Sequence, residues 1–138
     1  MKVYRCKVCG KVILILEERK VPTICCGQDM EEEVANTKEA ATEKHIPLYE
    51  TKEQKVEVNV GSVAHPMEKE HYIMWIALET NAGVQIHYLK SGEEPKATFA
   101  LTEEEQIKKS LCLLQLTWPL GKGKIIAKIG KVWYYKNS

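Results

Sequence analysis

The cysteines near the N-terminus have the type and spacing of a metal site. Cys6 and Cys9 form a Cys-x-x-Cys motif, Cys25 and Cys26 form a second pair, and a glycine directly follows each pair. Glycine at this place lets the backbone turn tightly, so that amide groups point at sulfur. Two such loops folded around one ion would make a tetrathiolate site, which holds zinc or iron.

The four thiols leave three interpretations open: an iron centre, a structural zinc knuckle, or an incidental thiol cluster. A chain of 138 residues with five cysteines fits metal ligands or reactive thiols better than a disulfide framework if it stays in a reducing compartment. The side chains of adjacent cysteines diverge and strain a tetrahedron, which is unusual for zinc. This favours iron.

The histidines form a second set of candidate ligands. His45, His65 and His71 are each expected at the end of a strand, where a site carried by loops would collect them. Neutral imidazole is a good ligand for ferrous iron, zinc and copper. His87 lies in the middle of an expected strand and is interpreted as a surface residue.

Charge and hydropathy limit the classes of partner. A formal net charge of +1 gives no electrostatic footprint for nucleic acid or for a membrane surface. No apolar run approaches the roughly 20 residues needed to span a bilayer, and the chain begins without the apolar core of a signal peptide. We therefore expect a cytoplasmic protein with no nucleic-acid or membrane partner.

Two units must position these residues. Residues 12 to 16 are expected to form a short strand between the two cysteine pairs, and the polar stretch from 31 to 44 is interpreted as a linker. We place the boundary near Asn36, with a metal-binding domain at 1–36 and a second domain at 37–138. The first domain is too small to bury much apolar surface, so its folding should depend on the metal.

The second unit has the period-two pattern of strands. Val56, Val58 and Val60 alternate with polar residues, and a further strand is expected at residues 97 to 101. Breaks at 81–83 and 90–92 separate the strands at the spacing of an antiparallel sandwich. We expect a second alternating face made by Tyr72, Met74, Ile76 and Leu78.

These motifs resemble a known family in combination. The stretches "EKHIP" and "VGSVAHPM…EH", with the tryptophan that follows, resemble the neelaredoxin-type domain of superoxide reductases. The Cys-x-x-Cys and Cys-Cys pairs resemble the desulforedoxin domain that is fused to it in desulfoferrodoxins. The resemblance covers residues 1 to about 109. It implies an all-β chain, with a small desulforedoxin-like domain before an immunoglobulin-like sandwich, assembled as a homodimer.

The resemblance also implies two iron centres. Cys6, Cys9, Cys25 and Cys26 would hold a rubredoxin-like iron that passes one electron. His45, His65 and His71 would be three of four equatorial ligands of a second iron, whose axial ligand is a cysteine thiolate. Superoxide would take one electron there and leave as hydrogen peroxide after two protonations.

Two charged residues and an electron donor complete what the resemblance implies. Lys44 matches a lysine that attracts the superoxide anion and orders a proton-donating water. Glu43 matches a carboxylate that caps the oxidised iron; without the neighbouring motif, the two would be interpreted as a solvated charge pair. Rubredoxin or a similar small carrier would supply the electron.

The C-terminal part departs from the family pattern. The family closes the second site with a Cys-Asn-x-His-Gly-x-Trp loop. Cys112, Gln115 and Trp118 keep the loop's spacing, but glutamine stands where the imidazole should be. An amide oxygen is a poor substitute for imidazole nitrogen on iron. Cys112 remains the spare thiol and is our candidate for the axial ligand.

A shift of the reading frame would explain why the C-terminal part departs from the family pattern. With suitable synonymous codons for residues 108 to 120, removal of one A from the Lys108–Lys109 codons makes the same letters encode Lys-Lys-Ala-Phe-Ala-Tyr-Cys-Asn-Leu-His-Gly-Leu-Trp. The complete family loop returns, with its cysteine two positions after Cys112. We therefore hypothesise a frameshift near Ser110, which would make the tail from 110 to 138 atypical sequence.

Two other functions remain open. The first is a non-catalytic electron-transfer or metal-binding module in which only the cysteine site works. The second is a structural zinc protein that uses its sandwich for protein contacts. The colour of an iron–thiolate centre separates the zinc alternative from the two iron alternatives, and superoxide consumption separates the reductase from the electron carrier.

Overall fold

The computed structural model describes residues 2–33, 47–61, 66–69, 71–116 and 124–130. All regular elements in these ranges are β-strands, so the expected all-β class is confirmed. Within the described ranges there is no helix long and apolar enough to cross a membrane. The predicted boundary at Asn36 falls outside the described residues.

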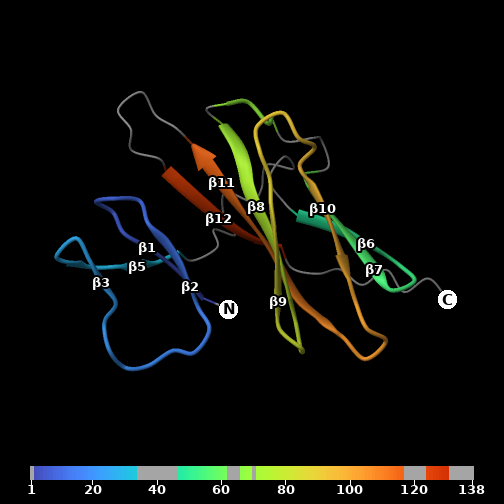
Figure 1. Ribbon diagram of the computed structural model, residues 1–138, viewed down its shortest axis with the longest axis horizontal. Helices are drawn as coiled ribbons and strands as arrows, with labels where there is room; N and C mark the ends of the chain where they lie inside the picture. The colour runs from blue at the N-terminus through green and yellow to red at the C-terminus, as the bar shows by residue number, and fades with distance from the viewer. Residues whose placement is uncertain (1, 34–46, 62–65, 70, 117–123, 131–138) are drawn as a thin grey trace.

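The first unit consists of five short strands. Three of them form a sheet in the order β2-β1-β5, and β3 and β4 form a separate hairpin. These strands are β1 (Lys2–Arg5), β2 (Val12–Ile15), β3 (Ile24–Cys25), β4 (Gln28–Asp29) and β5 (Glu31–Glu32). Figure 1 shows this unit, in blue, at one side of the remaining strands. The expected strand at residues 12 to 16 is therefore present as β2.

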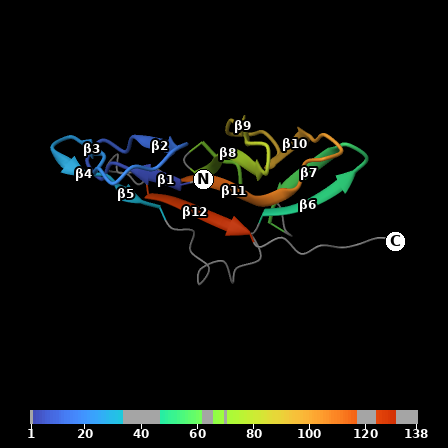
Figure 2. The same cartoon turned by 90° about the horizontal axis from the view of Figure 1, so that it is seen from below.

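Seven further strands form two antiparallel sheets. One sheet has the order β10-β7-β6 and the other has the order β12-β11-β8-β9. Their bounds are β6 (Pro47–Lys52), β7 (Lys55–Val60), β8 (His71–Thr80), β9 (Val84–Tyr88), β10 (Lys96–Ala100), β11 (Ile107–Leu116) and β12 (Lys124–Gly130). Figure 2 shows β6, β7 and β10 together on the side away from the first unit.

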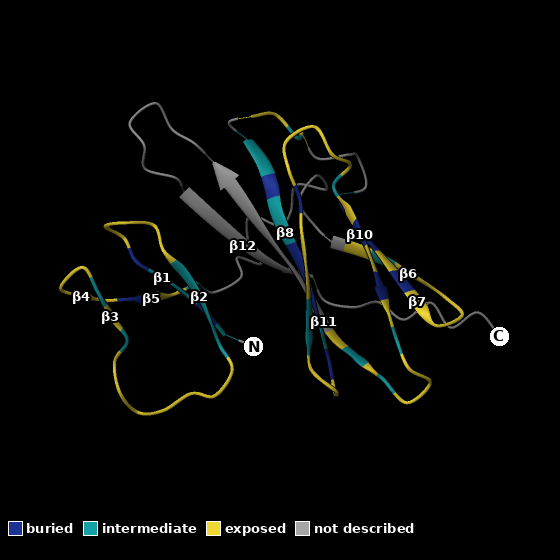
Figure 3. Ribbon diagram, viewed as in Figure 1, coloured by how far each residue is buried: buried dark blue, intermediate teal, exposed yellow. Residues whose placement is uncertain are grey.

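The core lies between these two sheets. Val56, Val58 and Val60 on β7 are at most 1% exposed, as their alternation with polar residues predicts. They pack with Ile76 and Leu78 of β8 in one apolar cluster. Full burial of each such side chain contributes about 1.5–3 kcal/mol, so this cluster fixes how the two sheets face each other. Figure 3 shows the buried stretches of β7, β8 and β10.

Strand β8 does not alternate regularly, which corrects one prediction. Simple alternation places Met74 on the face of Ile76, but Met74 packs in a second apolar cluster, while Ile73 joins Ile76 in the core. The cause is an irregularity in the pairing of β8 with β11, where the register passes from Trp75 directly to Ile73. One extra residue in a strand moves every side chain beyond it to the other face.

The second cluster joins the two units. Val3 of β1 and Ala77 of β8 are both buried, and Trp75, Met74 and Val84 pack against them. Ala77 lies between Ile76 and Leu78 and therefore faces away from the sandwich core. The first unit thus covers the outer face of β8, and both faces of this strand are buried.

Candidate metal centre

The Cys-x-x-Cys motif lies in a closed turn after β1. The backbone N–H of Gly10 donates to the carbonyl oxygen of Cys6 over 2.9 Å, and the Cys6 N–H donates to the Lys11 carbonyl oxygen, also over 2.9 Å. Gly10 has a φ of 76°, a conformation that glycine adopts without steric cost. This local hydrogen bonding brings Cys6 and Cys9 to the same side of the turn.

The second cysteine pair lies in the β3–β4 hairpin. Cys25 pairs with Gln28, so Cys26 and Gly27 form the two-residue loop. Their φ values are 52° and 73°, as in a type I′ turn, where glycine, asparagine and aspartate are the usual residues. A cysteine in this left-handed conformation carries backbone strain of about 1–2 kcal/mol. Strain of this kind is concentrated at functional sites.

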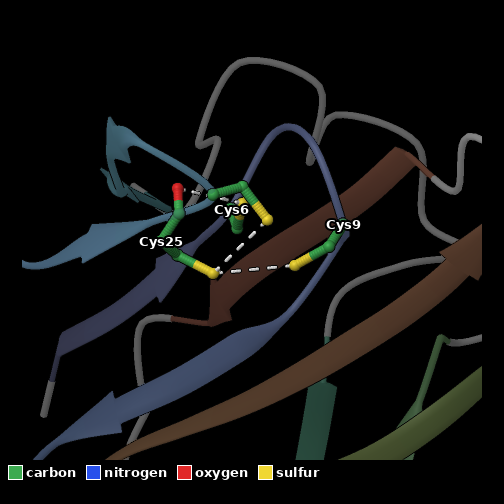
Figure 4. Close-up of side chains that lie close together, drawn as sticks. Cys6, Cys9 and Cys25 are labelled. Carbon is green, nitrogen blue, oxygen red and sulfur yellow. Dashed lines mark hydrogen bonds between the residues drawn. The ribbon is translucent and has the colours of Figure 1, made fainter.

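The four sulfur atoms fit a tetrahedral ion. One ligand atom from each of Cys6, Cys9, Cys25 and Cys26 lies within 4.8 Å of all the others. The Cys9 and Cys25 Sγ atoms are 3.7 Å apart, and those of Cys25 and Cys26 are 3.9 Å apart. Metal–sulfur bonds of about 2.3 Å in a tetrahedron give sulfur–sulfur edges of about 3.8 Å. Figure 4 shows the side chains of Cys6, Cys9 and Cys25 converging on one point.

The proton affinities of the thiols diverge. The pKa of Cys6 is lowered to about 6, chiefly because the Cys9 backbone N–H donates a hydrogen bond to its sulfur. The pKa of Cys25 is raised to about 12, first because its thiol hydrogen-bonds to Cys6 and then to Cys9. A metal ion must therefore displace protons from the cluster when it binds, which makes its affinity depend on pH.

The cluster is buried on one side and open on the other. Cys6 is 2% exposed, whereas Cys9 and Cys26 are exposed. Val8 directly precedes Cys9 and Ile24 directly precedes Cys25, and these two side chains are 58% and 65% exposed. In the sequence, only their positions next to candidate ligand cysteines could have identified these two residues. The open side of the cluster is therefore bordered by a small apolar rim.

Ion pairs tie the turns to the sheet of the first unit. Lys7, inside the Cys-x-x-Cys turn, pairs with Glu31 of β5 over 2.5 Å. Arg5, which precedes the turn, pairs with Glu33 over 2.5 Å, and both of these side chains are only 18% exposed. The first turn is thus held to β5, which follows the cysteine hairpin. Both cysteine pairs are therefore held by the same small sheet.

The second predicted site is described only in part. His71 is the first residue of β8 and is half-buried. Its backbone exchanges two hydrogen bonds of 3.0 Å with Glu68 in an isolated bridge. His45, His65, Lys44 and Glu43 lie outside the described residues, as does Trp118. His87 is exposed on β9, which agrees with its interpretation as a surface residue.

The register of β11 separates Cys112 from His71. Cys112 pairs with Ile76, whereas Leu116 pairs with His71 and Gln115 with Tyr72. His71 and Ile76 are five positions apart along β8, and their partners are four positions apart along β11, which corresponds to roughly 13–16 Å at the usual rise of a strand. Side chains stand about perpendicular to a sheet and reach little along it. The structure thus brings the four cysteines of the first unit together, whereas Cys112 as a ligand beside His71 stays a prediction.

Comparisons with known proteins agree with this arrangement. Two family models match: the desulfoferrodoxin N-terminal domain over residues 1–32 and desulfoferrodoxin over residues 37–117. A desulfoferrodoxin homolog of Archaeoglobus fulgidus is 39% identical over 88% of this chain and 97% of its own length. A desulfoferrodoxin of Desulfarculus baarsii is 37% identical over 86% of this chain and 94% of its own length.

A solved structure extends the likeness to three dimensions. The crystal structure of the superoxide reductase from Treponema pallidum aligns with a TM-score of 0.71 at 30% identity. The alignment covers 94% of this chain and 96% of that one. The likeness therefore includes both the cysteine unit and the sandwich.

Proposed function

The chain belongs to the desulfoferrodoxin family, a family of iron proteins, and on this premise we propose that it is a superoxide reductase. The reaction is the one-electron reduction of superoxide, with two protons, to hydrogen peroxide. A ferrous centre with histidine and cysteine ligands would carry the reaction, and the four-cysteine iron centre would transfer the electron.

The geometry of the four thiols is the observation that carries this proposal. Their mutual approach within 4.8 Å and the sulfur–sulfur distances of 3.7 and 3.9 Å suit one tetrahedral ion. Iron bound there supplies reversible one-electron chemistry. Cys9 and Cys26 are the exposed residues of the cluster, so an electron would enter or leave on their side.

We assign the substrate side to residues near the start of β8. The imidazoles of His45, His65 and His71 would hold the second iron. The Lys44 ammonium would attract the superoxide anion and order a water that donates a proton, and Glu43 would occupy the open position after product leaves. The electron donor would be a small carrier such as rubredoxin, and we propose that the chain acts as a homodimer in the cytoplasm.

The test compares matched histidine variants of anaerobically prepared protein. His71→Ala should lose the second iron and superoxide reduction, whereas His87→Ala, on an exposed strand position, should keep both. Superoxide can be generated enzymatically while hydrogen peroxide and dioxygen are measured. Reduction yields one peroxide per superoxide without dioxygen release, whereas dismutation releases dioxygen. Unchanged iron content and activity in His71→Ala would rule out the proposed site.

A second function is favoured by one observation. Cys112 pairs with Ile76 rather than with a residue near His71, which favours a chain whose second site lacks a thiolate. A protein with only the four-cysteine iron would be an electron carrier. It would hold about one iron per chain and would not consume superoxide.

A further inference from the structure

We infer that Met67 is a positioning residue for His71, acting through the backbone N–H of Ile73. This inference rests on the proposed function, because the placement of His71 matters there as that of a ligand of the second iron. It is carried by contacts among the described residues at the start of β8 and in the two loops beside it.

Met67 connects three segments of the sandwich. Its carbonyl oxygen accepts a hydrogen bond of 2.7 Å from the N–H of Gly92, which lies in the loop between β9 and β10. Its thioether sulfur accepts a hydrogen bond of 3.4 Å from the N–H of Ile73 on β8. Its side chain is half-buried and packs against the apolar cluster between the two sheets. The loop before β8 is therefore held both to β8 and to the β9–β10 loop.

The sulfur contact falls at the irregularity of β8. The pairing with β11 passes from Trp75 directly to Ile73, which leaves Met74 as the extra residue. A bulge of this kind disrupts the ladder of backbone hydrogen bonds beside it. Ile73 is only 1% exposed, and a buried N–H that lacks a partner is costly. The thioether of Met67 thus supplies an acceptor where the strand pairing is irregular.

His71 lies between this contact and a second backbone contact. Its backbone exchanges two hydrogen bonds of 3.0 Å with Glu68, the residue that follows Met67. Ile73, which donates to the sulfur, lies two positions after His71. The backbone of His71 is therefore fixed on both sides, although His71 is the first residue of its strand, a place where local opening is easy.

Tight placement of the strand start is what a metal ligand needs. Ligand side chains must be held within about 0.5 Å of the productive geometry. Groups that orient a ligand without touching the metal typically contribute a factor of about 10–100 to metal affinity. Met67 is a group of this kind, because its sulfur binds the N–H of Ile73 and so acts on His71 through the backbone.

The other explanation for Met67 is packing alone, since methionine often fills irregular gaps in cores. Two substitutions give opposite results under the two explanations. Met67→Leu keeps the apolar packing but removes the acceptor. Met67→Gln supplies an amide oxygen, a stronger acceptor than a thioether, but it brings a polar group to the edge of the core. Packing alone favours leucine, whereas positioning through the Ile73 N–H favours glutamine.

The experiment uses the full chain, loaded anaerobically with ferrous iron. The variants are Met67→Leu, Met67→Gln and a matched control, Met30→Leu, which makes the same substitution at a buried methionine of the first unit. Competition with a ferrous chelator measures the affinity of the second iron, and the absorption of the oxidised four-cysteine centre serves as the internal standard. Hydrogen exchange at the Ile73 amide and the denaturant midpoint are measured before and after the chelator removes the second iron.

We expect Met67→Leu to weaken binding of the second iron about tenfold. It should also speed exchange at Ile73 by about two- to tenfold, as the loss of one hydrogen bond implies, while its denaturant midpoint stays close to that of the parent chain. Met67→Gln should restore both the iron affinity and the slow exchange, and Met30→Leu should match the parent throughout. Unchanged iron affinity in Met67→Leu would overturn the inference, and so would a glutamine variant that is worse than the leucine variant in both readouts.

A further variant, His71→Ala, separates this inference from the proposed function. If the parent chain holds iron only at the four-cysteine centre, the second centre is absent and the proposed function fails, whatever the exchange at Ile73 shows. If the parent binds a second iron that His71→Ala removes, but Met67→Leu leaves its affinity unchanged, the proposed function stands and only the role of Met67 is overturned.

Discussion

The four-cysteine centre and the proposed second metal centre differ in how their ligands would be brought together. The four cysteines lie on two tight turns, each closed by hydrogen bonds between residues a few positions apart. The proposed second centre would depend on the pairing of β8 with β11, two strands that are separated by β9 and β10 in the sequence. One site is therefore defined by local spacing, and the other by a long-range strand register.

This difference determines what a small sequence error does. Two residues that are two positions apart on β11, Cys112 and Leu114, pair with Ile76 and Ile73, which are three positions apart on β8 because the register has an irregularity between them. The reading-frame slip that we hypothesise near Ser110 would leave the four-cysteine unit untouched and would alter only the part of the proposed second centre that follows residue 110. A site assembled from separate strands can thus be lost while the fold and the family likeness remain.

The largest expected effect is the loss of a ligand from the local site. Cys25→Ser should remove the four-cysteine iron and lower the iron content by about one per chain, because Cys25 approaches both Cys9 and Cys26. A structural metal contributes about 10–16 kcal/mol of apparent binding energy in small zinc domains, so residues 2–33 should become susceptible to proteolysis. Cys112→Ala is the control and should change neither property. Retention of the iron in Cys25→Ser would show that three thiols suffice.

The second prediction concerns the buried core on which the pairing of β8 depends. Ile76→Ala should destabilise the sandwich by about 2–5 kcal/mol, because this side chain is fully buried between the sheets. Ile86→Ala, at 43% exposure on β9, should cost less than about 0.5 kcal/mol. Denaturant unfolding measures both. The four-cysteine absorption should persist through the sandwich transition in Ile76→Ala; joint loss of both signals would mean that the two regions unfold as one unit.

The four-cysteine site is more predictable from sequence than the proposed second site, because the first depends on spacing within turns and the second on the register of distant strands. Spacing within a turn is visible in the chain, so Cys6, Cys9, Cys25 and Cys26 can be grouped from their spacing alone. The register of β8 and β11 is not visible in this way. Simple alternation places Met74 with Ile76, because it does not contain the irregularity beside Trp75. Motif spacing proposes Cys112 as a ligand, which stays a prediction.

The fold is predictable where burial is periodic. Val56, Val58 and Val60 all lie in the core, and the expected breaks at 81–83 and 90–92 separate strands as predicted. Packing of the first unit against β8 could not be predicted, because Val3 and Ala77 are small apolar residues with no distinctive pattern. The strain at Cys26 was also hidden, since it becomes apparent only from the backbone angle.

A smaller effect on stability comes from this backbone strain, which occurs in the cysteine hairpin and also in a turn of the sandwich. Cys26 and Glu53 have φ values of 52° and 53°, each in a short hairpin turn. Glu53→Gly should stabilise the sandwich by up to about 1 kcal/mol, because glycine adopts a positive φ without steric cost but loses more backbone entropy on folding. Cys26→Gly should relieve the same strain in metal-free protein but abolish tight iron binding.

Thermal unfolding of metal-free and iron-loaded protein checks this pair. A stabilised Glu53→Gly together with a Cys26→Gly that loses its iron would mean that the strain at Cys26 is retained for metal binding. If Cys26→Gly keeps the iron at full affinity, the strained cysteine has no role as a ligand, and the local site needs only three thiols.

The smallest expected effect is a change in stability at the end of β8 that is farthest from His71. The pKa of Glu105 is lowered, first because the Thr102 backbone N–H donates to its carboxylate over 2.8 Å, and then because the Thr80 hydroxyl donates over 2.9 Å. A carboxyl group whose pKa is lower in the folded chain stabilises the fold above its unfolded pKa of about 4.3, and this contribution disappears as pH falls through the folded value.

Glu105→Gln should therefore lower the melting temperature by a few degrees at pH 7, and its melting temperature should approach that of the parent chain near pH 3. Glu104→Gln, on an exposed neighbour, is the control and should match the parent at both pH values. Because Thr80 closes β8 at the end opposite His71, iron binding in both regions should be unchanged in Glu105→Gln. A loss of iron in this variant would show that strain at one end of β8 reaches the other, and that the β8–β11 register is less fixed than its ten-residue strands suggest.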